Sequence, residues 1–370
     1  MKYKIPLYKP LLSNSEKKYV NKCLNDNWIS SSGEFLTKFE NSFSNYTKIK
    51  FCTTTSNGTV ALHLALKILN IGKGDEVIVP SFTYIASVNC INHVNAKIIF
   101  CDSNIDTGQI DTFGIERKIN KKTRAIIVPH LYGNVTDMNR IIYLKKKYKL
   151  FIIEDCAEAI GSFYKKKHVG NFGDVATFSF FGSKTITTGE GGMICSNNKE
   201  LIKKAIKLKG QGLSKISNKL YYWHDEVGYN YRMTNICAAI GYAQIKKIRE
   251  ILKKKENVYN SYSKYLDKQN LKILNTTRKS KSSYWLICII LRNSRLRKKL
   301  MSFLKKMGIE TRNTFYLANT MKIYKRKVTG LKFAKKLADN GICLPSYPNL
   351  SNSQIKYIST QINYYLNRNK

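Results

Sequence analysis

Lys184 and Asp155 are the residues whose types and surroundings most clearly suggest chemistry. Lys184 follows the apolar run 175–180 and precedes the glycine cluster 189–192, and it has few basic neighbours although the chain holds 64 lysines and arginines. Asp155 ends the apolar run 150–155. A lysine amine can form a Schiff base with the aldehyde of pyridoxal phosphate (PLP), and a carboxylate can keep the pyridine nitrogen protonated. The pair predicts a PLP site.

The segment 53–59 predicts a place for the cofactor phosphate. It precedes an apolar stretch, 60–69, with helical spacing. A helix N-terminus offers free backbone N–H groups and the positive end of the helix dipole. The candidate phosphate ligands are Ser56, Asn57, Gly58 and Thr59. An ordinary helix N-cap explains the same residue types.

Further side chains follow other predicted strands. Ser179 lies shortly before Lys184 and could add its hydroxyl to the phosphate; the alternative is a strand serine bonded to its neighbours. Tyr84 follows the run 76–80, where it could stack on the pyridine ring, although Phe82 or a simple core role fits nearly as well. Glu158 would face the cofactor 3-hydroxyl or the amino group being transferred. A helix N-cap is the alternative for both Glu158 and Asp155.

Apolar, β-branched runs recur along the first two thirds of the chain with helical stretches between them. They cover 76–80, 96–102, 124–129, 150–154, 175–180 and 192–196. Runs that are apolar on both faces and separated by crossover-length segments predict a mostly parallel sheet between helix layers, an α/β fold. After about residue 244 the chain becomes helix-rich and very basic, with one clear strand at 284–291. We therefore predict a large α/β domain over 1–245 and a smaller α+β domain over 246–370.

Composition limits the class of protein. No run of about 18 apolar residues occurs and the N-terminus lacks a signal-peptide stretch, so we expect a cytoplasmic protein without membrane association. Nine cysteines are scattered without metal-ligand spacing, which favours free thiols and no metal site. The net charge of +40 could attract nucleic acid, but no nucleic-acid-reading motif accompanies the mostly lysine excess.

Taken together, these segments resemble the DegT/DnrJ/EryC1/StrS family of PLP-dependent nucleotide-sugar aminotransferases. The resemblance extends from 6–10 through 56–62, 75–81, 130–133 and the Lys184 segment to 344–348. It implies an aspartate-aminotransferase-like fold (fold type I). It also implies that Lys184 is the Schiff-base lysine and proton carrier, that Asp155 is the partner of the pyridine nitrogen, and that Gly58, Thr59 and Ser179 hold the phosphate.

The resemblance implies a homodimer with shared active sites, in which Asn230 reaches the phosphate of the other subunit. Asn230 belongs to the aromatic-rich segment 222–234, which suits base stacking and the gripping of phosphates or a carboxylate. The further candidates for substrate binding are His224, Arg232, Arg312 and Tyr316. The chain departs from the family pattern at 313, 317 and 319, positions that concern the wall of the sugar site.

The implied substrates are L-glutamate and a nucleotide-linked sugar. The implied reaction moves the amino group of glutamate to C4 of a 4-keto-6-deoxy sugar, with GDP-4-keto-6-deoxy-D-mannose as the predicted acceptor and UDP- or dTDP-linked keto sugars as alternatives. A relative that dehydrates its sugar has histidine where this chain has Lys184, so amino transfer is expected. A PLP-binding or nucleic-acid-binding protein without catalysis is the alternative of a different class.

Overall fold

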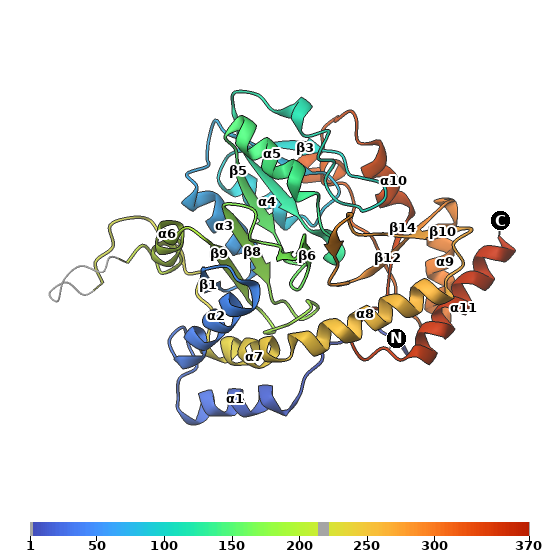
Figure 1. Cartoon of the computed structure of the whole chain (residues 1–370), viewed down its shortest axis with the longest axis horizontal. Helices are drawn as coiled ribbons and strands as arrows, with labels where there is room; N and C mark the ends of the chain where they lie inside the picture. The colour runs from blue at the N-terminus through green and yellow to red at the C-terminus, as the bar shows by residue number, and fades with distance from the viewer. Residues whose placement is uncertain (1–2, 214–221, 370) are drawn as a thin grey trace.

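The computed structural model describes residues 3–213 and 222–369 (Figure 1). Its centre is a seven-stranded sheet in which only one strand runs against the others. That strand is β9, and it lies between β1 and β8. In spatial order the strands are β1 (Phe51–Thr55), β9 (Gly192–Ser196), β8 (Val175–Ser179), β5 (Phe151–Asp155), β4 (Thr123–Pro129), β2 (Glu76–Pro80) and β3 (Lys97–Cys101). The prediction of a mostly parallel sheet is confirmed.

Helices cover both faces of this sheet. Alternate residues of each strand face opposite sides, and in these strands both sets are apolar and pack against helices. In β4, Ile126 and Val128 pack into one apolar cluster, whereas Ala125 and Ile127 pack into the other. The first cluster also contains residues of α1 (Asn14–Asn25), α2 (Glu34–Thr47), α5 (Met138–Tyr148) and α7 (Asn235–Lys246). The second contains residues of α3 (Gly58–Ile68), α4 (Ala86–His93) and α6 (Lys199–Lys209).

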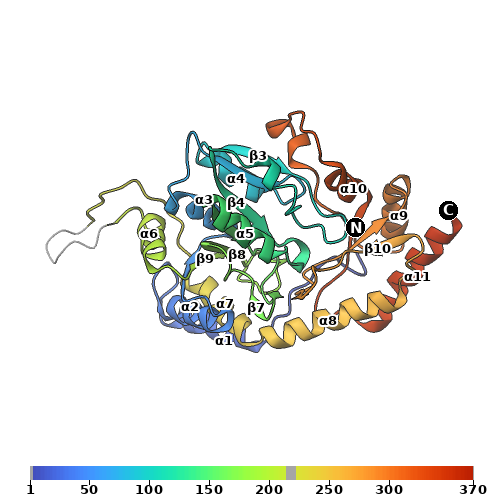
Figure 2. The same cartoon turned by 45° about the horizontal axis from the view of Figure 1, so that its top comes forward.

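A second, antiparallel sheet lies at the other end of the molecule, beside the C-terminal helices (Figures 1 and 2). Its strands, in spatial order, are β10 (Leu271–Ile273), β12 (Ile287–Leu291), β14 (Gly341–Leu344) and β13 (Arg312–Asn313). The helices that pack on it are α8 (Ile248–Tyr265), α9 (Arg295–Lys306), α10 (Lys332–Asn340) and α11 (Asn352–Arg368). The sequence identified only β12, because the other strands have four residues or fewer.

The two sheets are joined by the long helix α8 and by the N-terminal segment. Ile5 forms a parallel bridge with Ile309, and Leu7 packs beside Trp285 in an apolar cluster. A small third sheet, β11 (Ser280–Lys281), β6 (Phe163–Tyr164) and β7 (Lys167–His168), also links the two parts of the chain. The domain boundary at 245/246 falls near the junction of α7 and α8 and stays a prediction.

None of the described helices has the length and apolar character needed to cross a bilayer. All nine cysteines are free thiols. Two of them, Cys288 and Cys343, lie opposite each other on β12 and β14 with their sulfurs 3.3 Å apart.

Helix α8 carries a fully buried lysine. The Lys255 ammonium group donates to the carbonyl of Ser346 at 2.5 Å and lies 5.2 Å from the centre of the Tyr8 ring. No carboxylate pairs with it among the described residues. Because burial disfavours the charged amine, the pKa of Lys255 falls to about 7.

Lys255→Met should change how stability depends on pH. The pKa of Lys255 is about 7 when folded and ordinary, about 10.5, when unfolded, so between these values the unfolded chain binds more protons. The unfolding free energy of the wild type should therefore rise with pH above 7 by up to about 1.4 kcal/mol per pH unit relative to the variant. Urea unfolding at fixed protein concentration from pH 7 to 10 measures this difference.

Lys253→Met is the matched control, because Lys253 lies on the same helix with a side chain that is 71% exposed. It should leave the pH dependence as in the wild type. Parallel pH curves for the wild type and Lys255→Met would contradict the assigned state of Lys255.

Candidate active site

The carboxyl ends of the parallel strands bring the predicted residues to one edge of the large sheet. Thr55 at the end of β1 and Ser179 at the end of β8 both lie opposite Gly192. Asp155, at the end of β5, pairs with Thr177 in the next strand. Ligands of open α/β sheets bind at this edge. The topology therefore places the candidate phosphate and pyridine partners on the same side of the molecule.

The N-terminus of α3 faces Ser179 closely. A Cβ added to Gly58 would lie 2.8 Å from the Cβ of Ser179, so only glycine allows this approach. The side chain of Asn57 accepts a hydrogen bond from the Val60 N–H at 3.0 Å and caps the helix. Asn57 thus takes the N-cap role that the sequence left open. The amide of Ser56 donates to the carbonyl of Tyr231 at 2.9 Å. Thr59, the residue after Gly58, is partly exposed.

Asp155 is a buried carboxylate, 8% exposed, at the edge where the cofactor is expected. One oxygen accepts from the Ser87 hydroxyl of α4 at 2.6 Å, and the other accepts from the Ala157 N–H at 3.1 Å. No basic side chain forms an ion pair with it within the described ranges. A buried carboxylate is costly unless it is paired, so a cationic ring nitrogen suits its environment.

Lys184 is held from several directions. Its Nζ lies 3.7 Å from a Glu158 oxygen and 4.2 Å from the centre of the Trp285 ring, and its side chain is 13% exposed. The hydroxyl of Tyr8 donates to the Lys184 carbonyl at 2.6 Å. The backbone N–H of Lys184 donates to the carbonyl of Phe181 at 2.9 Å. The lysine and the predicted carboxylate Glu158 thus lie together.

Glu158 also accepts a hydrogen bond at 2.8 Å from the backbone N–H of Tyr132. Burial raises the pKa of Glu158 to about 7, and the nearby Lys184 opposes that rise. Tyr132 has a φ of 60°, a conformation that non-glycine residues rarely adopt. The strained backbone thereby directs an N–H at the carboxylate. Glu158 is not a helix N-cap, since no described helix begins next to it.

Tyr84 and Phe82 differ in their exposure, which the sequence alone could not show. Phe82 is fully buried in the core, whereas Tyr84 is 55% exposed at the sheet edge. The Tyr84 ring lies 5.9 Å from that of Phe315. Tyr84 is therefore the one of the two that is available to a bound ring.

The remaining predicted residues lie at the surface. Asn230 and Arg232 are exposed, and an Arg232 nitrogen donates to the Asn230 side-chain oxygen at 3.4 Å. His224 is exposed and contacts the Gln211 carbonyl at 2.9 Å. Arg312 and Tyr316 are exposed near β13. No hydrogen bond, ion pair or ring contact joins these five to Lys184 among the described residues.

The positions that depart from the family pattern have structural partners of their own. Asn319 is buried and accepts from the Ser81 hydroxyl at 2.7 Å. Leu317 is buried and forms a bridge with Phe82. The amide of Asn313 donates to the Tyr316 hydroxyl at 2.6 Å.

Four residues of the site were missed by the sequence analysis. They are Tyr8, Ser87, Tyr132 and Trp285. In that order they contact the Lys184 carbonyl, the Asp155 carboxylate, the Glu158 carboxylate and the Lys184 amine. Each comes from a segment distant in sequence from the residue that it contacts. Trp285, one of three tryptophans, lies in the predicted strand 284–291. Tyr8 and Tyr132 lie in the segments 6–10 and 130–133 that carry the family resemblance, which is the signal that could have found them.

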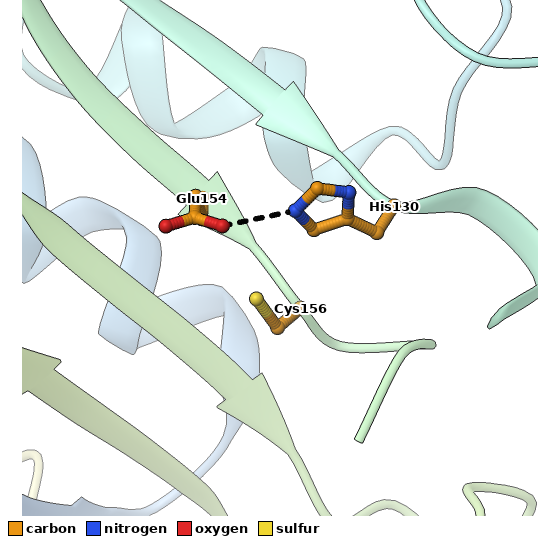
Figure 3. Close-up of side chains that lie close together, drawn as sticks. All are labelled: His130, Glu154 and Cys156. Carbon is orange, nitrogen blue, oxygen red and sulfur yellow. Dashed lines mark hydrogen bonds and ion pairs between the residues drawn. The ribbon is translucent and has the colours of Figure 1, made fainter. Parts of the chain in front are cut away.

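A compact buried group lies beside this site (Figure 3). It consists of His130, Glu154 and Cys156, whose ligand-type atoms lie within 4.8 Å of one another. His130 Nδ1 accepts from the Thr136 N–H at 3.3 Å, so its other ring nitrogen carries the proton and donates to Glu154 at 3.1 Å. That proton occupies the nitrogen a metal would need.

The Glu154 carboxylate is already saturated. Besides His130 it accepts backbone N–H groups of Gly170, Phe172 and Gly173 at 2.6 to 2.8 Å. Although burial acts to raise the pKa of Glu154, these hydrogen bonds and His130 hold it below its usual value. The group is a structural tie between β4, β5 and the 170–173 loop.

Comparisons with known proteins bear directly on this arrangement. The model of the DegT/DnrJ/EryC1/StrS aminotransferase family matches residues 10–363. The chain belongs to this family. Two similar proteins are named GDP-perosamine synthase. The one from Escherichia coli O157:H7 is 49% identical, and the match covers 99% of both chains. The one from Vibrio cholerae is 44% identical, and the match covers 98% of this chain and 99% of the relative.

Solved structures agree with the family. An aminotransferase from Psychrobacter cryohalolentis matches with a TM-score of 0.90 at 28% identity, covering 98% of this chain and 99% of its own. A proposed sugar aminotransferase from Streptococcus pneumoniae in its PLP form matches with a TM-score of 0.93 at 27% identity, covering 99% of both chains. The predictions of an aspartate-aminotransferase-like fold, of an aminotransferase and of PLP as its cofactor are confirmed.

The residues present fit PLP. Lys184 supplies a partly buried amine, Asp155 supplies a buried carboxylate without a described cationic partner, and the glycine at 58 lets the α3 N-terminus approach Ser179 closely.

Glu154→Gln should destabilise the fold. The glutamine amide would direct N–H groups at backbone donors that now share a carboxylate, so we expect a loss of about 3 to 5 kcal/mol. Urea unfolding at pH 7 measures this. Glu250→Gln is the control, because its side chain is 58% exposed and its ion pair with Lys254 spans 3.8 Å; it should cost less than about 1 kcal/mol. Equal small losses for both variants would contradict the structural role of Glu154.

Proposed function

We propose that this chain transfers the amino group of L-glutamate to C4 of GDP-4-keto-6-deoxy-D-mannose and produces GDP-perosamine. The observation that carries the proposal is the full-length match to two GDP-perosamine synthases at 49% and 44% identity. The partly buried Lys184 and the buried carboxylates Asp155 and Glu158 lie at one sheet edge and supply groups that such a transfer needs. Lysine at position 184, rather than histidine, favours amino transfer over dehydration.

The residues would share the work of holding the cofactor. The backbone N–H groups of Gly58 and Thr59 and the Ser179 hydroxyl would bind the phosphate at the positive end of α3. Ser56 belongs to the same turn, whereas the Asn57 side chain caps the helix. Tyr84 would lie against the ring face. Asp155, fixed by Ser87 and the Ala157 N–H, would keep the ring nitrogen protonated.

Bound PLP supplies an electron-withdrawing ring that stabilises negative charge on the carbon that loses its proton. Lys184 Nζ would take the proton from the α-carbon of glutamate and, in the second half of the reaction, would carry a proton in the reverse sense at the sugar C4. Glu158 lies 3.7 Å from this nitrogen. With a pKa of about 7, Glu158 can exchange between its charged and neutral forms near neutral pH.

We also infer a homodimer in the cytoplasm with active sites shared between subunits. Asn230 is exposed, and the carbonyl of the neighbouring Tyr231 accepts a hydrogen bond from the Ser56 amide of its own chain. The segment therefore lies beside the candidate phosphate ligands at 56–59. This placement leaves the Asn230 side chain available to the phosphate site of a second subunit. His224, Arg232, Arg312 and Tyr316 are exposed cations and aromatics suited to a nucleotide sugar, and nine free thiols suit a reducing compartment.

Lys184→Ala should abolish turnover. The variant lacks the amine that bonds to the cofactor and carries the proton, so we expect at least a ~1,000-fold loss of activity and loss of the visible absorbance band of lysine-bound PLP. Product formation is measured by NMR with glutamate and GDP-, UDP- and dTDP-linked 4-keto-6-deoxy sugars. Lys167→Ala is a suitable control, because its backbone lies in the small sheet and its side chain is exposed.

Full activity of Lys184→Ala would overturn the proposed catalytic role. Turnover of the UDP or dTDP sugar in preference to the GDP sugar would overturn the proposed substrate and keep the aminotransferase.

Mixing two inactive variants tests the shared site. Asn230→Asp places a negative charge against the phosphate, so it should reduce activity in the site that Asn230 serves. If that site lies in the other subunit, refolding Asn230→Asp together with Lys184→Ala gives hybrid dimers with one intact site and restores about a quarter of wild-type activity. Each variant refolded alone is the control. No restoration on mixing would show that Asn230 serves its own subunit.

A further inference from the structure

The Trp285 ring lies over the amine of Lys184. Trp285 lies two residues before the start of β12, comes from the C-terminal part of the chain and is 6% exposed. Its indole N–H donates to the carbonyl of Ser183 at 2.6 Å. It therefore holds the backbone of the residue before the lysine.

The same indole contacts the lysine side chain. Lys184 Nζ lies 4.2 Å from the centre of the ring, and the Glu158 oxygen lies 3.7 Å from the same nitrogen. An ammonium over a tryptophan face is attracted by the negative face of the ring, more strongly when the pair is shielded from water. The amine thus has one aromatic and one carboxylate partner.

The orientation of Trp285 is fixed from its other sides. The ring of Tyr132 lies nearly parallel to it, with an interplanar angle of 8° and centres 6.4 Å apart. Gly133, with a φ of 90°, lets the chain approach closely, since a Cβ there would lie 2.8 Å from the Trp285 backbone nitrogen. Tyr132 and Gly133 also belong to the turn that directs an N–H at Glu158. One turn therefore positions both partners of the amine.

We propose that Trp285 is a positioning residue that receives the amine of Lys184 on its indole face whenever that amine is not bonded to the cofactor. The proposal rests on the proposed role of Lys184. The contact keeps the amine beside Glu158 and limits the conformations of the lysine side chain. The amine can therefore return to the reacting carbon without sampling many other conformations. Trp285 acts through Lys184 and need not touch the substrate.

The kinetic test compares two substitutions. Trp285→Phe keeps an aromatic face and loses the N–H to Ser183, whereas Trp285→Leu loses both. We expect the single-turnover rate of PLP-loaded enzyme with glutamate to fall about 10-fold or more in Trp285→Leu and less in Trp285→Phe, with little change in the KM for glutamate. Trp28→Phe, at an indole that is 57% exposed, should leave the rate unchanged.

A fluorescence measurement reports the contact without activity. In a chain carrying Trp28→Phe and Trp223→Phe, Trp285 is the sole indole. Loaded with pyridoxamine phosphate, this protein should emit less than the same protein with Lys184→Met, because a contacting ammonium quenches indole emission.

The outcomes separate the two proposals. Unchanged single-turnover rates in Trp285→Leu, or equal emission with lysine and methionine at 184, would overturn the role of Trp285 in an enzyme whose wild type turns over normally. A wild-type chain that binds the cofactor without reacting with glutamate would overturn the proposed function and this inference with it.

Discussion

The hydrogen-bonded carboxylate of Glu154 is the constraint on which the site depends. It collects His130 and three backbone N–H groups of the 170–173 loop in a place without water access. Because alternate strand residues face opposite sides, fixing Glu154 toward one layer of helices turns Asp155 toward the other. There Asp155 meets Ser87 of α4. The end of β5 is thereby set in register with β4 and β8. Strand β8 ends at Ser179, which it brings to the same edge.

The second part of the site comes from outside the large sheet. Two aromatic side chains donate to successive carbonyls of the lysine turn, Trp285 to Ser183 and Tyr8 to Lys184. Tyr8 in turn lies beside the buried Lys255, which is tied to Ser346. The turn that carries the reactive amine is therefore clamped between the sheet edge and the C-terminal part of the chain. This arrangement restricts the amine without using charged partners other than Glu158.

The sequence predicted the large sheet well, because its strands are buried on both faces and give continuous apolar runs. The run 192–196 matches β9 in both bounds, although the sequence could not show that β9 is antiparallel. The short strands β10, β13 and β14 escaped, since two to four residues carry too little pattern. The sequence singled out Lys184, Asp155 and Glu158 because each ends or follows an apolar run that predicts a buried strand. Tyr8, Ser87 and Trp285 were not, because their contacts span long separations along the chain that no local pattern records.

Lys184, among the many lysines of this chain, is the residue that we propose bonds to the cofactor. Reducing PLP-loaded protein with borohydride converts the carbon–nitrogen double bond to a stable single bond, and peptide mass spectrometry then locates the label. The structure predicts the reduced cofactor on Lys184 alone, since this amine lies partly buried beside Glu158 and Trp285 at the cofactor edge. Label on a different lysine, or scattered over surface lysines with Lys184 unmodified, would contradict the account.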